Sequence, residues 1–145
     1  MTTHLETYIR DEIESLNKDI TPLQDLLSNV ACTRELKSIY VSTKRQCGKT
    51  SLINKLMCEF GSSFVFTQTR GIACVYHPFL KGRVFNVHNL DSDNFLRGLA
   101  KEPFFPLQYV FTDECKLSNE QIERLYMMRA IDRKTIFIGL GTDYK

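Results

Sequence analysis

The chain has 145 residues, the length of one domain of roughly 150 residues, which excludes a two-lobed helicase or an ATPase fused to a full nuclease domain. Hydrophobic residues make up 43% and charged residues 25% of the sequence, values that exclude wholesale disorder and predict one packed core. The formal net charge is only +2, so any contact with DNA would have to come from a local basic patch.

The cysteine pattern and the N-terminus predict a soluble cytoplasmic protein. The five cysteines are scattered, with no CxxC pair and no Cys/His pair at zinc spacing, a pattern that favours reduced thiols. The first 19 residues carry seven charges, too many for the apolar stretch of a signal peptide. No apolar run approaches the roughly 18 residues of a transmembrane helix, so we expect no membrane partner.

Two helices are predicted ahead of the first strand. An amphipathic helix over residues 3–16, within an N-terminal segment 1–18, presents one apolar stripe made of Leu5, Tyr8, Ile9, Ile13 and Leu16. This stripe either packs on its own domain, the favoured interpretation, or docks a partner. Thr21 as N-cap and Pro22 at the first helical position predict a second helix that runs through Val30.

The rest of the chain alternates predicted strands and helices. The strands are expected over 39–41, 64–67, 84–87, 109–112 and 135–140, and the helices over 49–60 and 119–130, with a helical turn over 94–100. Ser118 and Gln121 form a capping-box pattern at the start of the last helix. Such alternation predicts a three-layer α/β domain with a mostly parallel, five-stranded central sheet covered on both faces.

A phosphate-binding loop is predicted between the first strand and the helix over 49–60. The residues expected to contact a nucleotide there are Thr43, Lys44, Arg45, Gln46, Cys47, Gly48, Lys49, Thr50 and Ser51, with Thr43 in place of the usual first glycine. Backbone N–H groups at a helix N-terminus attract phosphate, and Gly48 allows the backbone a close approach. Lys49 would neutralise the β and γ oxygens, and Thr50 would offer its hydroxyl to Mg²⁺.

An acidic pair follows the strand over 109–112. Asp113 is expected near Mg²⁺, together with Thr50, and Glu114 is expected to polarise the water that attacks the γ-phosphate. A kinase would not need this second carboxylate to activate water. The pattern therefore favours a Mg²⁺-dependent ATP hydrolase over a phosphotransferase.

The segment Lys44–Thr50 resembles the phosphate loop of the large terminase subunits of tailed phages and herpesviruses, the ATPases that package viral DNA. The resemblance covers about residues 20–145 and rests on the order of its motifs along the chain. Besides the phosphate loop and the acidic pair, the similar segments are 22–24 (an adenine-reading segment), 64–74 (a strand and Thr-Arg turn), 95–98 (an Arg-Gly ahead of the acidic strand) and 136–142 (a coupling motif).

This resemblance implies a P-loop ATPase of the additional-strand, RecA-like and terminase-like kind, with the last strand inserted between the phosphate-loop strand and the acidic strand. It implies ATP and Mg²⁺ as ligands, and a nucleotide-sensing role for Thr142. Gln24 would read the adenine edge or else be an exposed helix glutamine. Arg45 would reach the γ-phosphate as an internal arginine finger or else be a solvated loop residue.

The implied working form is a homo-oligomeric ring on double-stranded DNA, in the host cytoplasm if the source is viral. A separate nuclease, a portal or another viral or host protein would be its partner, and no nuclease activity is expected from this chain. Two alternatives stay open. One is a catalytically weak binding protein derived from a terminase ATPase half, an inhibitor or adaptor; the other is a small nucleotide kinase, although no lid with clustered arginines is found.

Overall fold

The computed structural model describes residues 4–17, 27–43, 48–68, 83–92 and 106–141. Within this part of the chain, five strands form a single sheet in which all pairs are parallel. The strands are β1 (Ser38–Ser42), β2 (Ser63–Thr67), β3 (Val84–Asn86), β4 (Tyr109–Asp113) and β5 (Ile136–Gly141). The expected parallel sheet is therefore confirmed.

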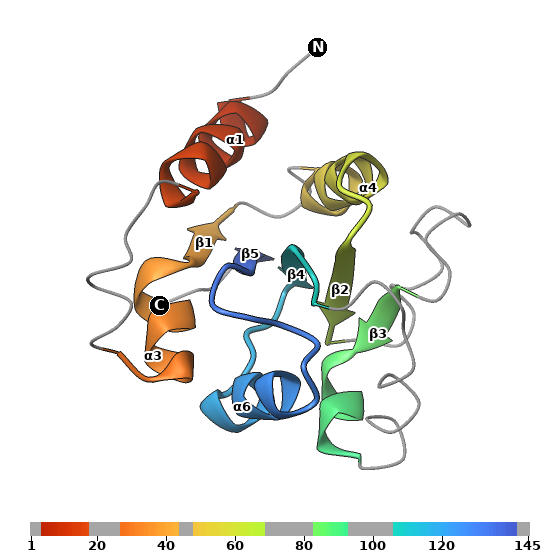
Figure 1. Ribbon diagram of the computed structural model, residues 1–145. Helices are drawn as coiled ribbons and strands as arrows, with labels where there is room; N and C mark the ends of the chain where they lie inside the picture. The colour runs from red at the N-terminus through yellow and green to blue at the C-terminus, as the bar shows by residue number, and fades with distance from the viewer. Residues whose placement is uncertain (1–3, 18–26, 44–47, 69–82, 93–105, 142–145) are drawn as a thin grey trace.

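The strand order is β1-β5-β4-β2-β3 (Figure 1). The last strand in the sequence thus lies between β1 and β4, as expected, with Tyr40 opposite Gly139 and Thr112 on the other side of Gly139. Every residue of β5 is buried, because parallel strands inside a doubly covered sheet have no solvated face.

Helices cover both faces of the sheet. The structure has α1 (His4–Leu16), α3 (Asn29–Leu36), α4 (Lys49–Glu59), the 3-10 helix η3 (Val87–Asp91) and α6 (Asn119–Met127). In Figure 1, α1 and α4 lie above the sheet, whereas α3 and α6 lie below it. The described residues therefore form three layers.

Two apolar cores result, one on each face. Alternate residues along a strand point to opposite faces, so Phe64 and Phe66 pack toward α6 while Val65 between them packs toward α4. The core on the α4 side also takes Ile9 and Ile13 of α1. The preferred interpretation of the N-terminal helix, packing on its own domain, is confirmed.

The predicted set of residues on the buried face of α1 is partly wrong. Tyr8 is 50% exposed, whereas Glu6 is buried at 4%. Glu6 accepts hydrogen bonds of 2.9 Å from both Lys55 Nζ and Arg10 Nε, which lets a carboxylate occupy a buried helical position. Positions 6, 9 and 13 follow gaps of three and four, so the buried face is rotated away from Tyr8.

Several predicted boundaries also differ from the structure. The helix expected to run through Val30 is wrong at its end, because the Ser28 side chain accepts a hydrogen bond from the Ala31 N–H and starts α3 there. The strand over 84–87 stops at Asn86, whose side chain caps η3 through the His88 N–H. The helices over 49–60 and 119–130 end one and three residues early, at Glu59 and Met127. The predictions for residues 21–26 and 94–100 lie outside the described residues.

Candidate functional site

The candidate site lies at the carboxyl ends of β1, β5 and β4, where the N-terminus of α4 meets the sheet. β1 leads directly into Thr43, whose N–H donates a 2.7 Å hydrogen bond to the Gly141 carbonyl at the end of β5. The Thr43 hydroxyl also donates to this carbonyl, at 3.3 Å. The last residue of β5 therefore fixes the start of the predicted phosphate loop.

The N-terminus of α4 differs from those of α3 and α6 in its capping. Ser28 and Ser118 cap α3 and α6 with their side chains, but among the described residues no side chain caps α4. Its N-cap is Gly48, with φ 83° and ψ 20° in the left-handed region. Glycine is favoured at position 48 by this positive φ and not by crowding, because a Cβ placed there would meet nothing within 4 Å in the described chain.

Thr50 and Asp113 join α4 to β4. Thr50 Oγ1 donates a 2.8 Å hydrogen bond to Asp113 Oδ2 across 63 residues of sequence. Asp113 is fully buried on a strand with neighbours on both sides, opposite Leu140 of β5 and Thr67 of β2. Both residues were predicted as metal ligands, and the structure brings them together.

Lys49 and Glu114 form the second contact between the two segments. Lys49 Nζ lies 2.6 Å from Glu114 Oε1, and the side chains are 14% and 30% exposed. Glu114 has φ 60°, a left-handed conformation that is uncommon for a residue with a Cβ. Its N–H donates a 2.9 Å hydrogen bond to the Leu140 carbonyl. The acidic pair is therefore held by β5 as well as by α4.

These β5 contacts could not be predicted from side chains. The carbonyls of Leu140 and Gly141 bind Glu114 and Thr43 respectively, and every residue except proline could supply the same main-chain groups. The useful signal was the apolar run over 135–140, which placed a buried strand there without indicating its hydrogen bonds.

The nearest cysteine to the acidic pair is structural. The Cys115 Sγ donates to the Phe66 carbonyl at 3.3 Å, and burial raises the pKa of this thiol to about 12. A thiol in that state carries almost no thiolate at neutral pH and is a poor nucleophile.

Six predicted site residues lie outside the part of the chain that the structure describes: Gln24, Lys44, Arg45, Gln46, Cys47 and Thr142. Ser51 is described and is exposed in the first turn of α4. The structure thus describes Thr43 and the second half of the predicted loop, from Gly48, together with the acidic pair.

The donor chemistry at Thr50 and Asp113 fits Mg²⁺. A search of the described ranges finds no group of three or more His, Cys, Asp or Glu side chains that could hold a metal. Mg²⁺ does not need such a group, because in nucleotide sites it takes one or two protein oxygens together with phosphate oxygens and water. A hydroxyl and a buried carboxylate 2.8 Å apart are two such oxygens.

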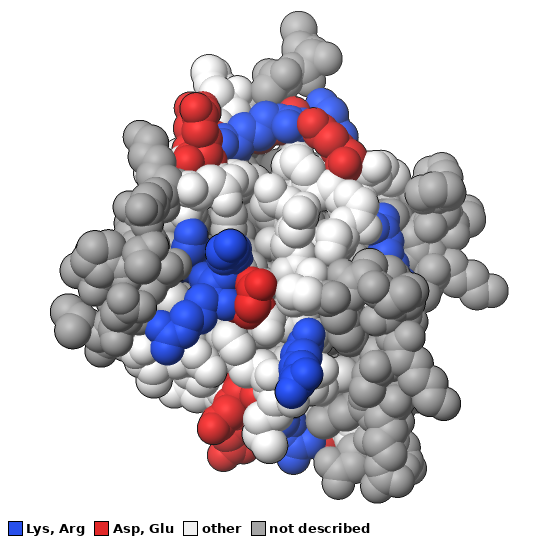
Figure 2. Space-filling view, in the orientation of Figure 1, with Lys and Arg blue, Asp and Glu red and all other residues white. Residues whose placement is uncertain are grey.

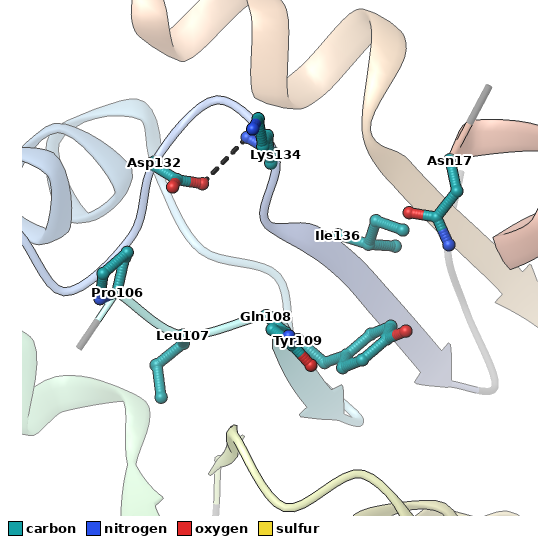
Figure 3. A pocket seen from close by; sticks show the side chains of 8 residues that line it. All are labelled: Asn17, Pro106, Leu107, Gln108, Tyr109, Asp132, Lys134 and Ile136. Atoms are coloured by element: carbon teal, nitrogen blue, oxygen red, sulfur yellow. Dashed lines mark hydrogen bonds between the residues drawn. The ribbon is translucent and has the colours of Figure 1, made fainter. Parts of the chain in front are cut away.

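A separate surface cavity of about 440 Å³ opens at the amino-terminal end of β4 and β5, away from the candidate site (Figure 3). Its lining comes from Asn17, residues 106–109, Asp132, Lys134 and Ile136. Asp132 Oδ1 accepts the Lys134 N–H at 2.9 Å, the dashed line in Figure 3. This carboxylate therefore shapes the turn that precedes β5.

Charge is mixed on the face seen in Figure 2. Acidic and basic side chains alternate over α1 and α4, where Arg10 pairs with both Glu6 and Glu59. Hydrogen bonds to Lys55 and then to Arg10 lower the pKa of Glu6. The charges over these two helices thus bind one another across the α1–α4 contact.

Among the described helices none is both long and apolar enough to cross a membrane. No protein-family model matches the sequence, and a search of the curated proteins finds no match either.

Proposed function

We propose that this chain binds and hydrolyses ATP with Mg²⁺, as a P-loop ATPase of the terminase-like, additional-strand kind. The observation that carries the proposal is the convergence of two segments at one end of the sheet. Lys49 and Thr50 begin α4, whereas Asp113 ends β4 and Glu114 follows it. The Lys49 side chain contacts Glu114, and the Thr50 side chain contacts Asp113. Ligands of parallel α/β sheets bind at this carboxyl edge.

Phosphate binding is assigned to the start of α4. No side chain in the described part of the chain caps its first turn. The positive end of the helix dipole favours an anion there. Lys49 adds a full positive charge at the same place, and its 14% exposure limits screening by water. The helix terminus and the ammonium together suit the β- and γ-phosphates.

Thr50 and Asp113 would hold Mg²⁺. Bound there, the ion would neutralise charge on the phosphate oxygens. The Thr50 hydroxyl, which donates to Asp113 in this structure, would turn its oxygen to the ion, while Asp113 remains an oxygen ligand fixed by its buried strand.

We assign to Glu114 the activation of the attacking water. Its carboxylate is the more exposed of the two acids and follows the end of β4, so a water molecule can reach it. Glu114 would accept a hydrogen bond from that water and take its proton as the oxygen attacks the γ-phosphorus. The bond from that phosphorus to the bridging oxygen breaks, and the products are ADP and phosphate.

The biological role that we propose is a subunit of a DNA-packaging or DNA-translocating motor, acting as a ring on double-stranded DNA with a nuclease or portal partner. Its support is the order of the terminase-like motifs together with the position of β5 between β1 and β4. A catalytically weak binding protein of the same fold is the alternative that the test must separate.

The test is Mg²⁺-dependent release of phosphate from ATP, measured with and without double-stranded DNA. Glu114→Gln should lower kcat by roughly 10²- to 10⁴-fold, the usual contribution of a general base, while Glu123→Gln, an exposed acid on α6, should leave it unchanged. Stimulation by DNA would favour the motor. ATP binding without turnover in either condition would contradict the hydrolase and favour the binding protein.

A further inference from the structure

We infer that the Lys49–Glu114 ion pair is an autoinhibitory latch, closed when the site holds no nucleotide and opened by the phosphates of an incoming ATP. The inference rests on the proposed function and adds a regulatory step to it. The 2.6 Å contact joins the residue assigned to phosphate charge with the residue assigned to the attacking water.

The contact opposes both assigned roles. A lysine ammonium is a point charge, and while it sits 2.6 Å from Glu114 Oε1 its charge is already neutralised by a carboxylate. The same contact commits that carboxylate oxygen to the ammonium. A phosphate group therefore competes with Glu114 for the Lys49 charge, and loss of this contact makes the Glu114 carboxylate available to water.

Glu114 is the more exposed member of the acidic pair, and its contact with Lys49 is separate from the contact between Thr50 and Asp113. Asp113 is fully buried and keeps its separate hydrogen bond to Thr50. The Glu114 backbone is held by the Leu140 carbonyl at 2.9 Å. Its side chain, 30% exposed, has access to solvent. We expect the latch to open by rotation of the Glu114 side chain, with its backbone N–H still bound to the Leu140 carbonyl.

The energetic consequence is a competition. The apparent dissociation constant of ATP equals the intrinsic constant divided by the fraction of molecules with the latch open. A latch that is closed in nine molecules out of ten weakens ATP binding by about tenfold. Removing the Glu114 charge should therefore strengthen ATP binding even though it lowers kcat.

Two measurements test the latch. The first is the affinity for ATP in EDTA, by isothermal titration, for the wild type, Glu114→Gln and the control Glu123→Gln. Glu114→Gln should bind ATP about tenfold more tightly, and the control should match the wild type. Equal affinities in all three proteins would overturn the inference.

The second measurement does not need ATP. Acetylation of Lys49 by an N-hydroxysuccinimide ester, followed by peptide mass spectrometry, reports whether the ammonium is paired, with the exposed Lys134 as internal reference. Glu114→Gln should raise the Lys49 rate several-fold in the nucleotide-free protein, and Glu123→Gln should not. An unchanged Lys49 rate would overturn the latch even if ATP affinity rose, because general charge repulsion would then explain the affinity.

The pair of measurements separates the latch from the proposed function. A faster Lys49 rate in Glu114→Gln, with no ATP binding by any protein in EDTA and none by Glu114→Gln in Mg²⁺, would keep the ion pair but remove the ATPase, and with it the latch as a regulatory step. ATP binding of equal strength with an unchanged Lys49 rate would keep the nucleotide site and remove the latch. Circular dichroism and urea midpoints establish that each variant is folded.

Discussion

The hydroxyl of Thr50 donates a 2.8 Å hydrogen bond to the buried carboxylate of Asp113. This contact links the first turn of α4 to the central strand β4. Lys49, just before Thr50, and Glu114, just after Asp113, form the ion pair beside it. Because Asp113 is fully buried, the hydrogen bond contributes to stability as well as to the proposed metal site.

Thr50→Val should destabilise the protein by about 1.5 to 3 kcal/mol, because it removes a donor to a buried charged acceptor while keeping the shape of the side chain. Thr50→Ser keeps the hydroxyl and should lose less than half of that amount. Urea unfolding in EDTA measures both. If valine and serine had equal effects, the hydrogen bond would not be the source of the stability.

Gly48→Ala should cost about 1 to 2 kcal/mol in unfolding free energy. The φ of 83° is strained for an L residue, while open space around the position removes any steric contribution from the described residues. Gly61→Ala is the matched control, since Gly61 is also in open space but has no left-handed φ. A loss of the same size at Gly61 would mean that φ does not explain the Gly48 effect.

Gly139→Ala should destabilise the protein through crowding rather than through backbone strain. A Cβ at Gly139 would lie 2.3 Å from Tyr40 Cδ1 and 2.6 Å from Thr112 Oγ1, and overpacking of this kind costs about 1 to 3 kcal/mol. In a double-mutant cycle with Tyr40→Ala, the alanine at 139 should cost at least about 0.5 kcal/mol less once the ring is absent. If the two substitutions had strictly additive effects on the free energy of unfolding, contact with the Tyr40 ring would not be the cause of the Gly139→Ala effect.

Glu6→Gln should reduce stability at neutral pH more than at acid pH. Hydrogen bonds from Lys55 and Arg10 lower the pKa of Glu6 below its ordinary value of 4.5. A depressed folded pKa stabilises the native state above the unfolded pKa, and this contribution is lost as the pH falls through the folded value.

Melting temperatures at pH 7 and across the range below pH 4.5 measure this difference. The gap between wild type and Glu6→Gln should narrow steadily as the pH falls below 4.5. Glu14→Gln, an exposed acid on the same helix, is the control. A gap that stays constant with pH would show that the Glu6 charge is not responsible.

The sheet could be predicted well from the sequence because its strands are short, continuous apolar runs. The segments 64–67 and 109–112 lie within β2 and β4, and 135–140 overlaps β5 with a one-residue shift. The Ser118–Gln121 capping box also forms as predicted, since it depends only on residues three positions apart.

The α3 helix could not be predicted in the same way. Its sequence from Asn29 to Leu36 has weak apolar periodicity, and its contacts to α6 come from far along the chain. Thr33 hydrogen-bonds the Tyr126 hydroxyl, and Arg34 donates to Asn119. Polar contacts across 85 to 93 residues leave no local pattern in the sequence.

The local chemistry can be predicted from the amino-acid sequence: a Gly-Lys-Thr at a helix start and an Asp-Glu at a strand end. Which of these side chains meet depends on the tertiary fold. The pairing of Lys49 with Glu114 rather than Asp113, the left-handed backbone at Glu114, and the Leu140 and Gly141 carbonyls that hold the site all depend on β5 lying beside both β1 and β4. Such contacts are set by neighbouring strands in space, and residues 63 to 98 positions apart acquire them only when the sheet is complete.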